Sequence, residues 1–502
     1  MAVAPSAGEA PPLRFHTKLL YAVGATATNL KLRALSTFLV IFYNQVVGLP
    51  PQLVGSILAV AMVFDAVLDP IVGQISDNVR SRWGRRHPFM LAAALPYALA
   101  FYLLWNPPAD WSHGALAIYL GVCLFAVRFF DTFFELPHQA LAPELVRGYH
   151  ERTNLLSLRQ FFMVLGGLGM TVLAYQVFLK EQPDGTGGVL AREGYVAYSI
   201  TGALIIFATI ILSTLGTASR IPHLAQPPAR KITLKAMVLE MAQTLNNRAF
   251  LSAALAMMFI AVAVGARNGL EIYFGLYFWE LRQSQLAVLA TMSVIGGFLG
   301  VLLAPVVGRV LGKKNGVIAV FATAILVHIT PVTLRLLDLA PANGTTALLW
   351  LLYGEEIINA TFAAATGILL ASIIADVVED AEVKTGRRSE GLLLSANNLF
   401  RKVISGMGVF IATGVLTLIA FPDKAERGQV PPEVLQNLGL AYIPTIVGLY
   451  GIAIGLLLTY NINQKRHDEN LAKLADRAAE QAAAEAGPGI GSGEIPTEPG
   501  RR

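Results

Sequence analysis

Long apolar segments, separated by short polar or glycine- and proline-rich connections, dominate the pattern along the chain. A helix needs about 20 apolar residues to cross roughly 30 Å of hydrocarbon, so each of these segments is long enough to span a membrane. The pattern predicts twelve spans, at 19–44, 52–77, 88–106, 114–140, 155–179, 195–219, 249–279, 285–311, 316–337, 345–374, 390–420 and 437–461. We therefore expect an all-α membrane protein with twelve transmembrane helices.

The composition excludes a soluble protein. Charged residues make up 14% of the 502 residues and hydrophobic residues 55%, whereas an average soluble domain is about 25% charged. The net charge of +5 does not indicate nucleic-acid binding, because basic residues of membrane proteins gather in cytoplasmic loops. The single cysteine, Cys123, excludes an intrachain disulfide and a cysteine-based zinc site. Met1–Pro12 lacks the pattern of a cleavable signal peptide.

Basic residues are distributed unevenly between alternate connections. The connections 78–88, 143–154, 220–248, 309–314 and 384–388 hold 17 Lys and Arg residues, and the other six connections hold 5. By the positive-inside rule, this asymmetry places both termini in the cytoplasm. We expect a monomeric protein integral to the cytoplasmic (inner) membrane.

An internal repeat divides the chain into two halves. Residues 69–74, Asp-Pro-Ile-Val-Gly-Gln, precede a basic turn at 82–86, and residues 304–309, Ala-Pro-Val-Val-Gly-Arg, precede a basic turn at 312–314. Both copies lie late in the second span of their half, as in the parallel repeats of major facilitator transporters. We predict that fold: two pseudo-symmetric six-helix bundles at 19–219 and 249–461, a cytoplasmic linker at 220–248, a cytoplasmic N-terminus at 1–18 and a partly disordered cytoplasmic tail at 462–502.

Ionisable residues inside the predicted spans are candidates for function, because each is costly to bury in a membrane. Asp65 and Asp69 lie four residues apart and so share one helix face, about 6 Å apart along the axis. Two such carboxylates repel each other in a low dielectric, and a bound cation or proton relieves the repulsion. The pair predicts a sodium or proton site; the alternative is salt bridging to Lys or Arg alone.

The fourth span carries a continuous polar stripe, spaced at three and four residues, that must face the protein interior. Its members are Arg128, Asp131, Thr132, Glu135, His138 and Gln139. Arg128 and Asp131 can form a structural pair, whereas Thr132 and Glu135 suit a cation or a hydroxylated ligand. His138 is either a ligand contact or a satisfied core histidine.

Other spans contribute further polar positions. In the seventh span, Arg267 and Glu271 lie four residues apart and can neutralise each other. In the eleventh span, Lys402 is the expected partner of the acidic cluster, because a buried ammonium needs a carboxylate. The remaining positions are Thr28, Asn29, Lys31 and Arg33 in the first span, Asn268 in the seventh, Glu355, Glu356 and Asn359 in the tenth, and Asn398, Arg401 and Ser405 in the eleventh.

Two cytoplasmic segments have the alternating charges of gates that pair across a cavity mouth, although either can equally be a solvated loop. The first contains Gly73, Asp77, Arg80, Arg85 and Arg86. The second contains Asp376, Glu379, Asp380, Glu382, Lys384, Arg387 and Arg388.

These motifs resemble those of the glycoside-pentoside-hexuronide:cation symporters, the melibiose permease family. The resemblance rests on the runs 65–77 and 81–88, on the run 375–391 that leads to Lys402, and on the opening run 18–24; it covers roughly residues 15–460. It implies uptake of a sugar, glycoside or hexuronide by alternating access, driven by sodium or proton entry and with no other cofactor. It places the coupling ion, including a sodium ion if that is the ion used, at Asp65 and Asp69, gives Thr132 and Lys402 the positions of the family's threonine and lysine, and puts the sugar-binding carboxylate at Glu135.

Three departures from the family pattern bear on the substrate and the ion. Leu68 replaces an asparagine that binds sodium, Asn29 replaces an aspartate that binds sugar hydroxyls, and Gln139 replaces an aromatic residue that stacks on sugar. The loss of an oxygen ligand favours proton over sodium coupling. The additional cations Arg33, Arg128 and Arg267 suit a substrate with a carboxylate, such as a uronide or another organic anion.

Two other classes of function are weighed against symport. An intramembrane enzyme has no support, because the chain contains no HExxH, GxSxG or Walker A motif. A lysolipid transporter on the same fold remains an alternative. The preferred mechanism is that cation binding at Asp65 and Asp69 repositions Lys402 and orders a substrate site around Asn29, Glu135 and Arg159, with contributions from His138, Gln139 and Arg267.

Overall fold

The computed structural model describes residues 13–79, 81–146, 149–181, 187–224, 248–385 and 407–460, together with Glu469 and Lys473. The first half of the chain forms α1 (Phe15–Val23), α2 (Ala25–Thr37), α3 (Leu39–Ile41), the π-helix η1 (Phe42–Val47), α4 (Pro51–Asn78), α5 (His87–Leu104), α6 (His113–Leu145), α7 (Tyr149–Leu173), the π-helix η2 (Ala174–Phe178), α8 (Arg192–Ala218) and the short 3-10 turn η3 (Ile221–His223). The second half forms α10 (Arg248–Tyr273), the π-helix η4 (Phe274–Phe278), α11 (Gln283–Leu311), α12 (Lys313–Leu336), α13 (Thr346–Thr385) and α15 (Pro432–Leu458).

The prediction of an all-α membrane protein is confirmed. Within the described residues, ten helices are long and apolar enough to cross a membrane, and Met407–Leu418 forms a shorter apolar helix. The first predicted span is divided into α1, α2, α3 and η1 and is not among the ten. The eleventh predicted span lies partly outside the described residues, so the count of twelve stays a prediction.

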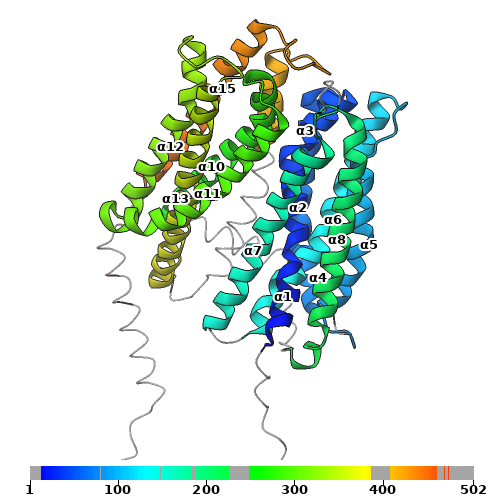
Figure 1. The fold of residues 1–502 in the computed structure, drawn as a ribbon. Coiled ribbons are helices and arrows are strands. Elements are labelled where there is room, and N and C mark those ends of the chain that lie inside the picture. Colours follow the sequence, from blue (N-terminus) through cyan, green and yellow to red (C-terminus); the bar gives the residue numbers. More distant parts are fainter. Residues whose placement is uncertain are drawn as a thin grey trace, which may run out of the picture.

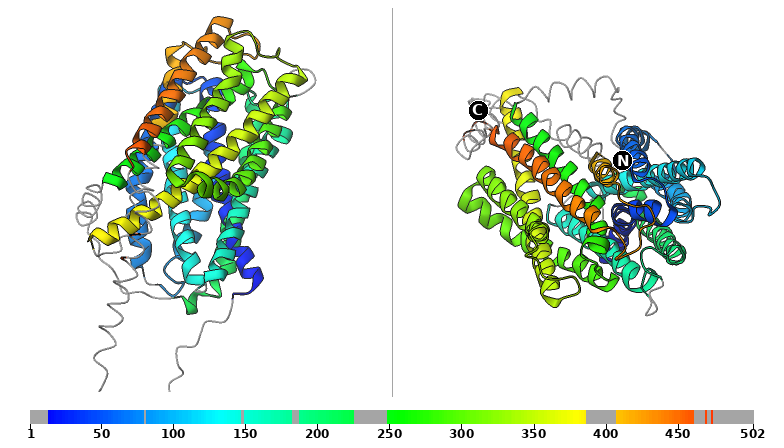
Figure 2. Two further views of the ribbon diagram at one scale, coloured as in Figure 1. Left: turned by 90° about the vertical axis from the view of Figure 1, so that its left-hand side faces the viewer. Right: turned by 90° about the horizontal axis from the view of Figure 1, so that it is seen from above.

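The helices gather into two groups (Figure 1). α1–α8 lie on one side and α10–α13 with α15 on the other, and the view from above separates the same groups (Figure 2). Most of the predicted linker at 220–248 lies outside the described residues. Large apolar side chains such as Leu302, Val310 and Leu326 are exposed on the outer helices, as expected of surfaces that face lipid.

Two local features repeat between the halves. The first span of each half ends in a π-helix, η1 at Phe42–Val47 and η4 at Phe274–Phe278. The second span of each half contains an internal proline, Pro70 in α4 and Pro305 in α11. η1 stops at Gly48, whose φ of 94° suits glycine and ends the helix.

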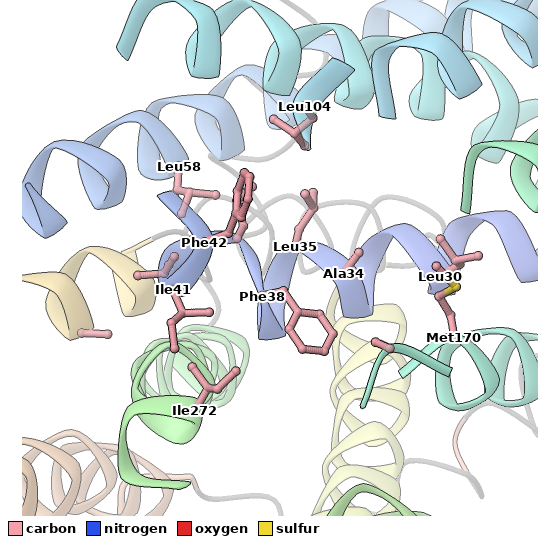
Figure 3. Close-up of a cluster of buried hydrophobic side chains, with 14 of the residues drawn as sticks. Leu30, Ala34, Leu35, Phe38, Ile41, Phe42, Leu58, Leu104, Met170 and Ile272 are labelled. Carbon is pink, nitrogen blue, oxygen red and sulfur yellow. The ribbon is translucent and has the colours of Figure 1, made fainter. Parts of the chain in front are cut away.

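The first span lies at the centre of the packing (Figure 3). Leu30, Phe38 and Phe42 are almost completely buried. The side chains around them come from α4, α5, α7 and α10, namely Leu58, Leu104, Met170 and Ile272. Because Ile272 belongs to the second half, this cluster also joins the two groups of helices.

Glycines bring α11 and α13 into direct contact. A Cβ atom at Gly296 would lie 2.5 Å from the carbonyl oxygen of Ile357 and 2.7 Å from the Cβ of Ala360. No real side chain makes such short contacts with backbone, so glycine is required for this approach, as at small-residue contacts between membrane helices. α11 and α13 therefore pack backbone against backbone.

Candidate functional site

Two acidic side chains of α4 meet polar side chains of α6, as the sequence predicts for a cation site. The Arg128 guanidinium forms an ion pair with Asp65, and the Thr132 hydroxyl donates to Asp69 over 3.3 Å. The side chains of Arg128 and Asp65 are 7% and 10% exposed. Asp65 is therefore a buried carboxylate that a protein cation already neutralises.

This pairing differs from the one expected within the fourth span. Arg128 does not pair with Asp131; a lysine of α2, Lys31, forms the ion pair with Asp131 instead. The Tyr97 hydroxyl of α5 donates a second hydrogen bond of 2.9 Å to the same carboxylate. Lys31 and Asp131 are both buried, so α2, α5 and α6 are held together by a three-residue network.

The predicted partner lysine of the acidic cluster, Lys402, lies outside the described residues. Its assignment to the cation site therefore stays a prediction. Asp69 makes contacts beyond the one with Thr132. The structure brings Asp65, Asp69 and Thr132 together, three of the four residues predicted for the coupling ion.

The predicted substrate residues of the first half lie on α2, α6 and α7. The Asn29 side chain donates to the carbonyl oxygen of Met163 over 2.5 Å. Gln139 donates to Glu135 over 2.6 Å, which joins two predicted substrate residues on one face of α6. Arg159 has a buried Nε without a hydrogen-bond partner, so this guanidinium retains an unused donor.

His138 is fully enclosed. Its ring stacks on Tyr21 with centroids 4.4 Å apart and on Phe134 at 5.0 Å. Its Nε2 lies 2.9 Å from the carbonyl oxygen of Tyr21, whose hydroxyl donates back to the carbonyl oxygen of His138 over 3.0 Å. This geometry favours the alternative of a satisfied core histidine over a ligand contact.

A second polar network lies in the second half. Arg267 of α10 forms an ion pair of 2.8 Å with Glu356 of α13 rather than with Glu271 of its own helix. Asn359 supports the guanidinium when its amide oxygen faces the two terminal nitrogens, at 2.6 and 3.0 Å. Arg267, predicted to bind substrate, is thus anchored to α13 by two side chains.

The same network contains a histidine that sequence reasoning missed. His328 of α12 has its Nδ1 2.8 Å from a carboxylate oxygen of Glu355 and its Nε2 2.6 Å from the Tyr442 hydroxyl of α15. The side chains of His328 and Glu355 are 14% and 13% exposed. A single polar residue in an apolar helix gives no periodic signal, which explains why His328 and Tyr442 were not predicted.

The described gate residues pair within their own halves. Arg85 and Arg86 both contact Glu144 at the end of α6, at 2.5 and 2.6 Å. In the second half, Lys313 contacts Asp376 of α13 at 2.5 Å. The side chains of Asp77 and Glu379 and the whole of Arg387 lie outside the described part of the chain, so pairing across a cavity mouth stays a prediction.

Contacts between the halves gather at one end of the molecule, where η1, η4 and residues 420–431 meet. Asn44 donates to Asp423 over 2.8 Å and accepts from the Tyr273 hydroxyl over 2.8 Å. Gln45 donates to the Pro422 carbonyl oxygen over 3.1 Å. Gln45 also accepts from the Ala425 backbone N–H over 2.7 Å and from the Tyr277 hydroxyl over 3.4 Å.

We call this set of contacts the amide latch, and define it by Asn44, Gln45 and their five partners in the second half. Both amide side chains are buried. Sequence reasoning missed it, although the polar pair Asn44-Gln45 at the end of an apolar span was an available signal.

Comparisons with known proteins place the chain among transporters. Residues 20–464 match the family described as MFS/sugar transport protein. The isoprimeverose transporter of Lactiplantibacillus pentosus is 24% identical over 92% of this chain and 92% of the relative, and the glucuronide carrier protein homolog of Escherichia coli (strain K12) is 22% identical over 93% and 96%. An uncharacterized symporter of Synechocystis, sll1374, is 38% identical, but the match spans 35% of this chain and 33% of that relative.

Solved structures show the same fold. A bacterial homolog of the human lysosomal transporter Spinster, in an inward-facing and unoccupied conformation, superposes with a TM-score of 0.65 at 14% identity, over 91% of this chain and 99% of that chain. The nucleoside transporter NupG superposes with a TM-score of 0.58 at 13% identity, over 89% of this chain and 99% of that chain.

Proposed function

The chain belongs to the MFS/sugar transport protein family, and from this premise we propose that it carries a glycoside or hexuronide across the membrane together with a proton. Family membership confirms the predicted symporter family and the major facilitator fold, and it identifies a transporter rather than an enzyme. Cation-coupled sugar symport is the function of this class of protein. The identity of the substrate and of the ion is the part that we propose.

The ion pair between Asp65 and Arg128 is the observation that favours a proton. Sodium prefers a shell of oxygen ligands, and a carboxylate already paired with a guanidinium in a buried site is a poor member of such a shell. Removing one partner of a buried pair costs about 3–5 kcal/mol. A proton needs only one acceptor oxygen, and its binding at Asp69, which contacts Thr132, does not require the Asp65–Arg128 pair to break.

The unused donor of Arg159 supports a substrate that carries a carboxylate. Guanidinium groups bind carboxylates with directed, charge-assisted hydrogen bonds, and the Nε of Arg159 is buried without a partner. The Nε of Arg128 is also buried without a partner, but the guanidinium groups of Arg128 and Arg267 already form ion pairs with Asp65 and Glu356. Relatives named for isoprimeverose and for glucuronide support both neutral and acidic saccharides as candidates.

Alternating access is the mechanism that we propose for this carrier. The amide latch closes the molecule at the end where η1 and η4 lie. By the positive-inside rule, this end faces outward and both termini lie in the cytoplasm. The carrier then acts as a monomer in the cytoplasmic membrane and opens by exchanging contacts at its two ends.

Transport by purified protein in proteoliposomes tests this proposal. The panel contains neutral glycosides, a hexuronide and a lysolipid, each measured with an inward proton gradient, an inward sodium gradient or neither. We expect the proton gradient to stimulate uptake of one saccharide and Asp69→Asn to abolish that stimulation. Stimulation by sodium alone, or undiminished coupling in Asp69→Asn, contradicts the proposal, and uptake of lysolipid alone supports the alternative substrate.

A further inference from the structure

The two halves contain versions of one polar network, built from corresponding spans. In the first half, a cation of the first span, Lys31, pairs with a carboxylate of the fourth span, Asp131. In the second half, Arg267 of the first span pairs with Glu356 of the fourth span. Because the spans correspond in the parallel repeat, the two ion pairs are counterparts.

The third span of each half completes the network with a different kind of group. In the first half, the hydroxyl of Tyr97 donates to Asp131, and a phenol remains neutral over the physiological pH range. In the second half, the third span offers His328, which contacts Glu355, the neighbour of the paired Glu356. Histidine is the side chain that gains and loses a proton near neutral pH.

We propose that His328 and Glu355 form a proton-binding site of the second half, separate from Asp69, and that its proton takes part in the transport cycle. The proposal rests on proton coupling as the proposed function. When neutral with the proton on Nδ1, the imidazole donates to Glu355 and accepts from the Tyr442 hydroxyl. A proton that binds at Nε2 makes an imidazolium, and the Tyr442 hydroxyl then accepts from it instead of donating.

Charged groups of α10 and α13 lie around His328. α13 contributes Glu355 and Glu356, α10 contributes Arg267 and Glu271, and α15 contributes the Tyr442 hydroxyl. α11 contributes Ser293, a neutral group next to Glu356. Three carboxylates therefore face one guanidinium among the described residues. A proton that binds at His328 therefore changes the balance of charge in this network.

α10 connects this site to the contact between the halves. The helix that carries Arg267 and Glu271 also carries Tyr273 and continues through η4 to Tyr277. Tyr273 and Tyr277 donate to Asn44 and Gln45 of the amide latch. Glu271 is exposed, so water can reach the helix face next to Arg267. A charge change at His328 is thus one helix away from the contacts that close one end of the carrier.

The inference is tested by measuring two kinds of transport separately: accumulation driven by a proton gradient, and counterflow, which needs no gradient. Variants His328→Gln and Glu355→Gln are reconstituted with the saccharide identified in wild-type transport, then assayed for counterflow at equal pH and for accumulation driven by a proton gradient. Gln keeps hydrogen-bonding atoms but does not titrate over this range. We expect counterflow within about twofold of wild type and proton-driven accumulation at least tenfold lower. Tyr442→Phe is expected to shift the pH midpoint of accumulation while retaining it.

The controls separate this inference from the proposed function. His113→Gln removes an exposed histidine at the start of α6 and is expected to change neither assay. Wild type without proton-driven accumulation contradicts the proposed function itself. Proton-driven accumulation by wild type and by both His328→Gln and Glu355→Gln overturns the second site and leaves Asp69 as the proposed site. If one of the two Gln variants fails to fold, the other variant and Tyr442→Phe test the inference. Loss of both counterflow and accumulation in these variants indicates a purely structural role and overturns the inference.

Discussion

The hydrogen bonds of the amide latch allow an estimate of the free energy that holds this end of the carrier closed. Asn44 and Gln45 make five hydrogen bonds to the second half, through Tyr273, Tyr277, Pro422, Asp423 and Ala425. A net contribution of about 0.5–1.5 kcal/mol for each of the four neutral bonds, and about 1.5–3 kcal/mol for the bond to Asp423, gives roughly 3.5–9 kcal/mol for the set. Shifting a two-state equilibrium from 1:99 to 99:1 takes about 5.5 kcal/mol. Removal of the latch is therefore large enough to reverse the preferred state.

The perturbation is the double substitution Asn44→Ala with Gln45→Ala. It removes hydrogen bonds that join the two halves only while this end is closed. In the open state the groups of both halves bond to water instead. We expect the protein to populate a state that is open at this end. Spin labels at Asp110→Cys and Thr346→Cys, two exposed positions on opposite halves, report the opening as a shift to longer distances in double electron–electron resonance.

The labelling is simple because Cys123 is the one native cysteine and can be replaced by serine. Asn106→Ala is the matched control: it loses bonds to the Tyr102 carbonyl oxygen and the Ser199 hydroxyl, both in the first half. The control is expected to lower the melting temperature without changing the distance between the two spin labels. An unchanged distance distribution in a folded Asn44→Ala, Gln45→Ala protein would refute the assignment of the latch as a determinant of conformation.

Two further predictions concern packing and burial of charge. Gly296→Ala places a methyl group against the Ile357 carbonyl oxygen and is expected to destabilise the protein by about 1–3 kcal/mol; Gly297→Ala, with open space around its Cβ, is the control, and equal melting temperatures would contradict the close approach. Lys31→Met is expected to destabilise by about 3–5 kcal/mol because it leaves Asp131 buried without its cation. The double variant with Asp131→Leu is expected to recover much of that loss in thermal unfolding, and no recovery would argue against a direct pair.

The class of structure and the family could be predicted because they depend on long-range patterns. Span length, the charge asymmetry and the repeat around Asp69 and Ala304 each extend over many residues. The motif also identified Asp65, Asp69 and Thr132, which the structure brings together. Helix periodicity specifies which side chains share a face, and this was sufficient to group the residues of α6.

Partner choice could not be predicted, because it depends on how helices pack. Arg128 lies near Asp131 in sequence, yet pairs with Asp65 of another helix. Arg267 likewise pairs with Glu356, which is 89 residues away, and not with Glu271 of its own helix. In both cases a long side chain reaches across a helix interface. Glu356 is buried and Glu271 is exposed, so Arg267 neutralises the more costly charge, whereas the buried Asp131 is neutralised by Lys31 instead of Arg128.

The pair between Lys31 and Asp131 has a consequence for how the chain is made. The first span is divided into short helices, so it is not among the continuous membrane-crossing helices of the described residues, and it carries the buried Lys31. Its partner is synthesised 100 residues later, which at about 5–20 residues per second takes about 5–20 s. During that interval the Lys31 ammonium lacks the carboxylate that it pairs with in the structure, so the first span is expected to remain at the translocon or the membrane surface. We therefore expect the first span to insert stably only after α6 has been synthesised, so the order of synthesis affects how the protein folds.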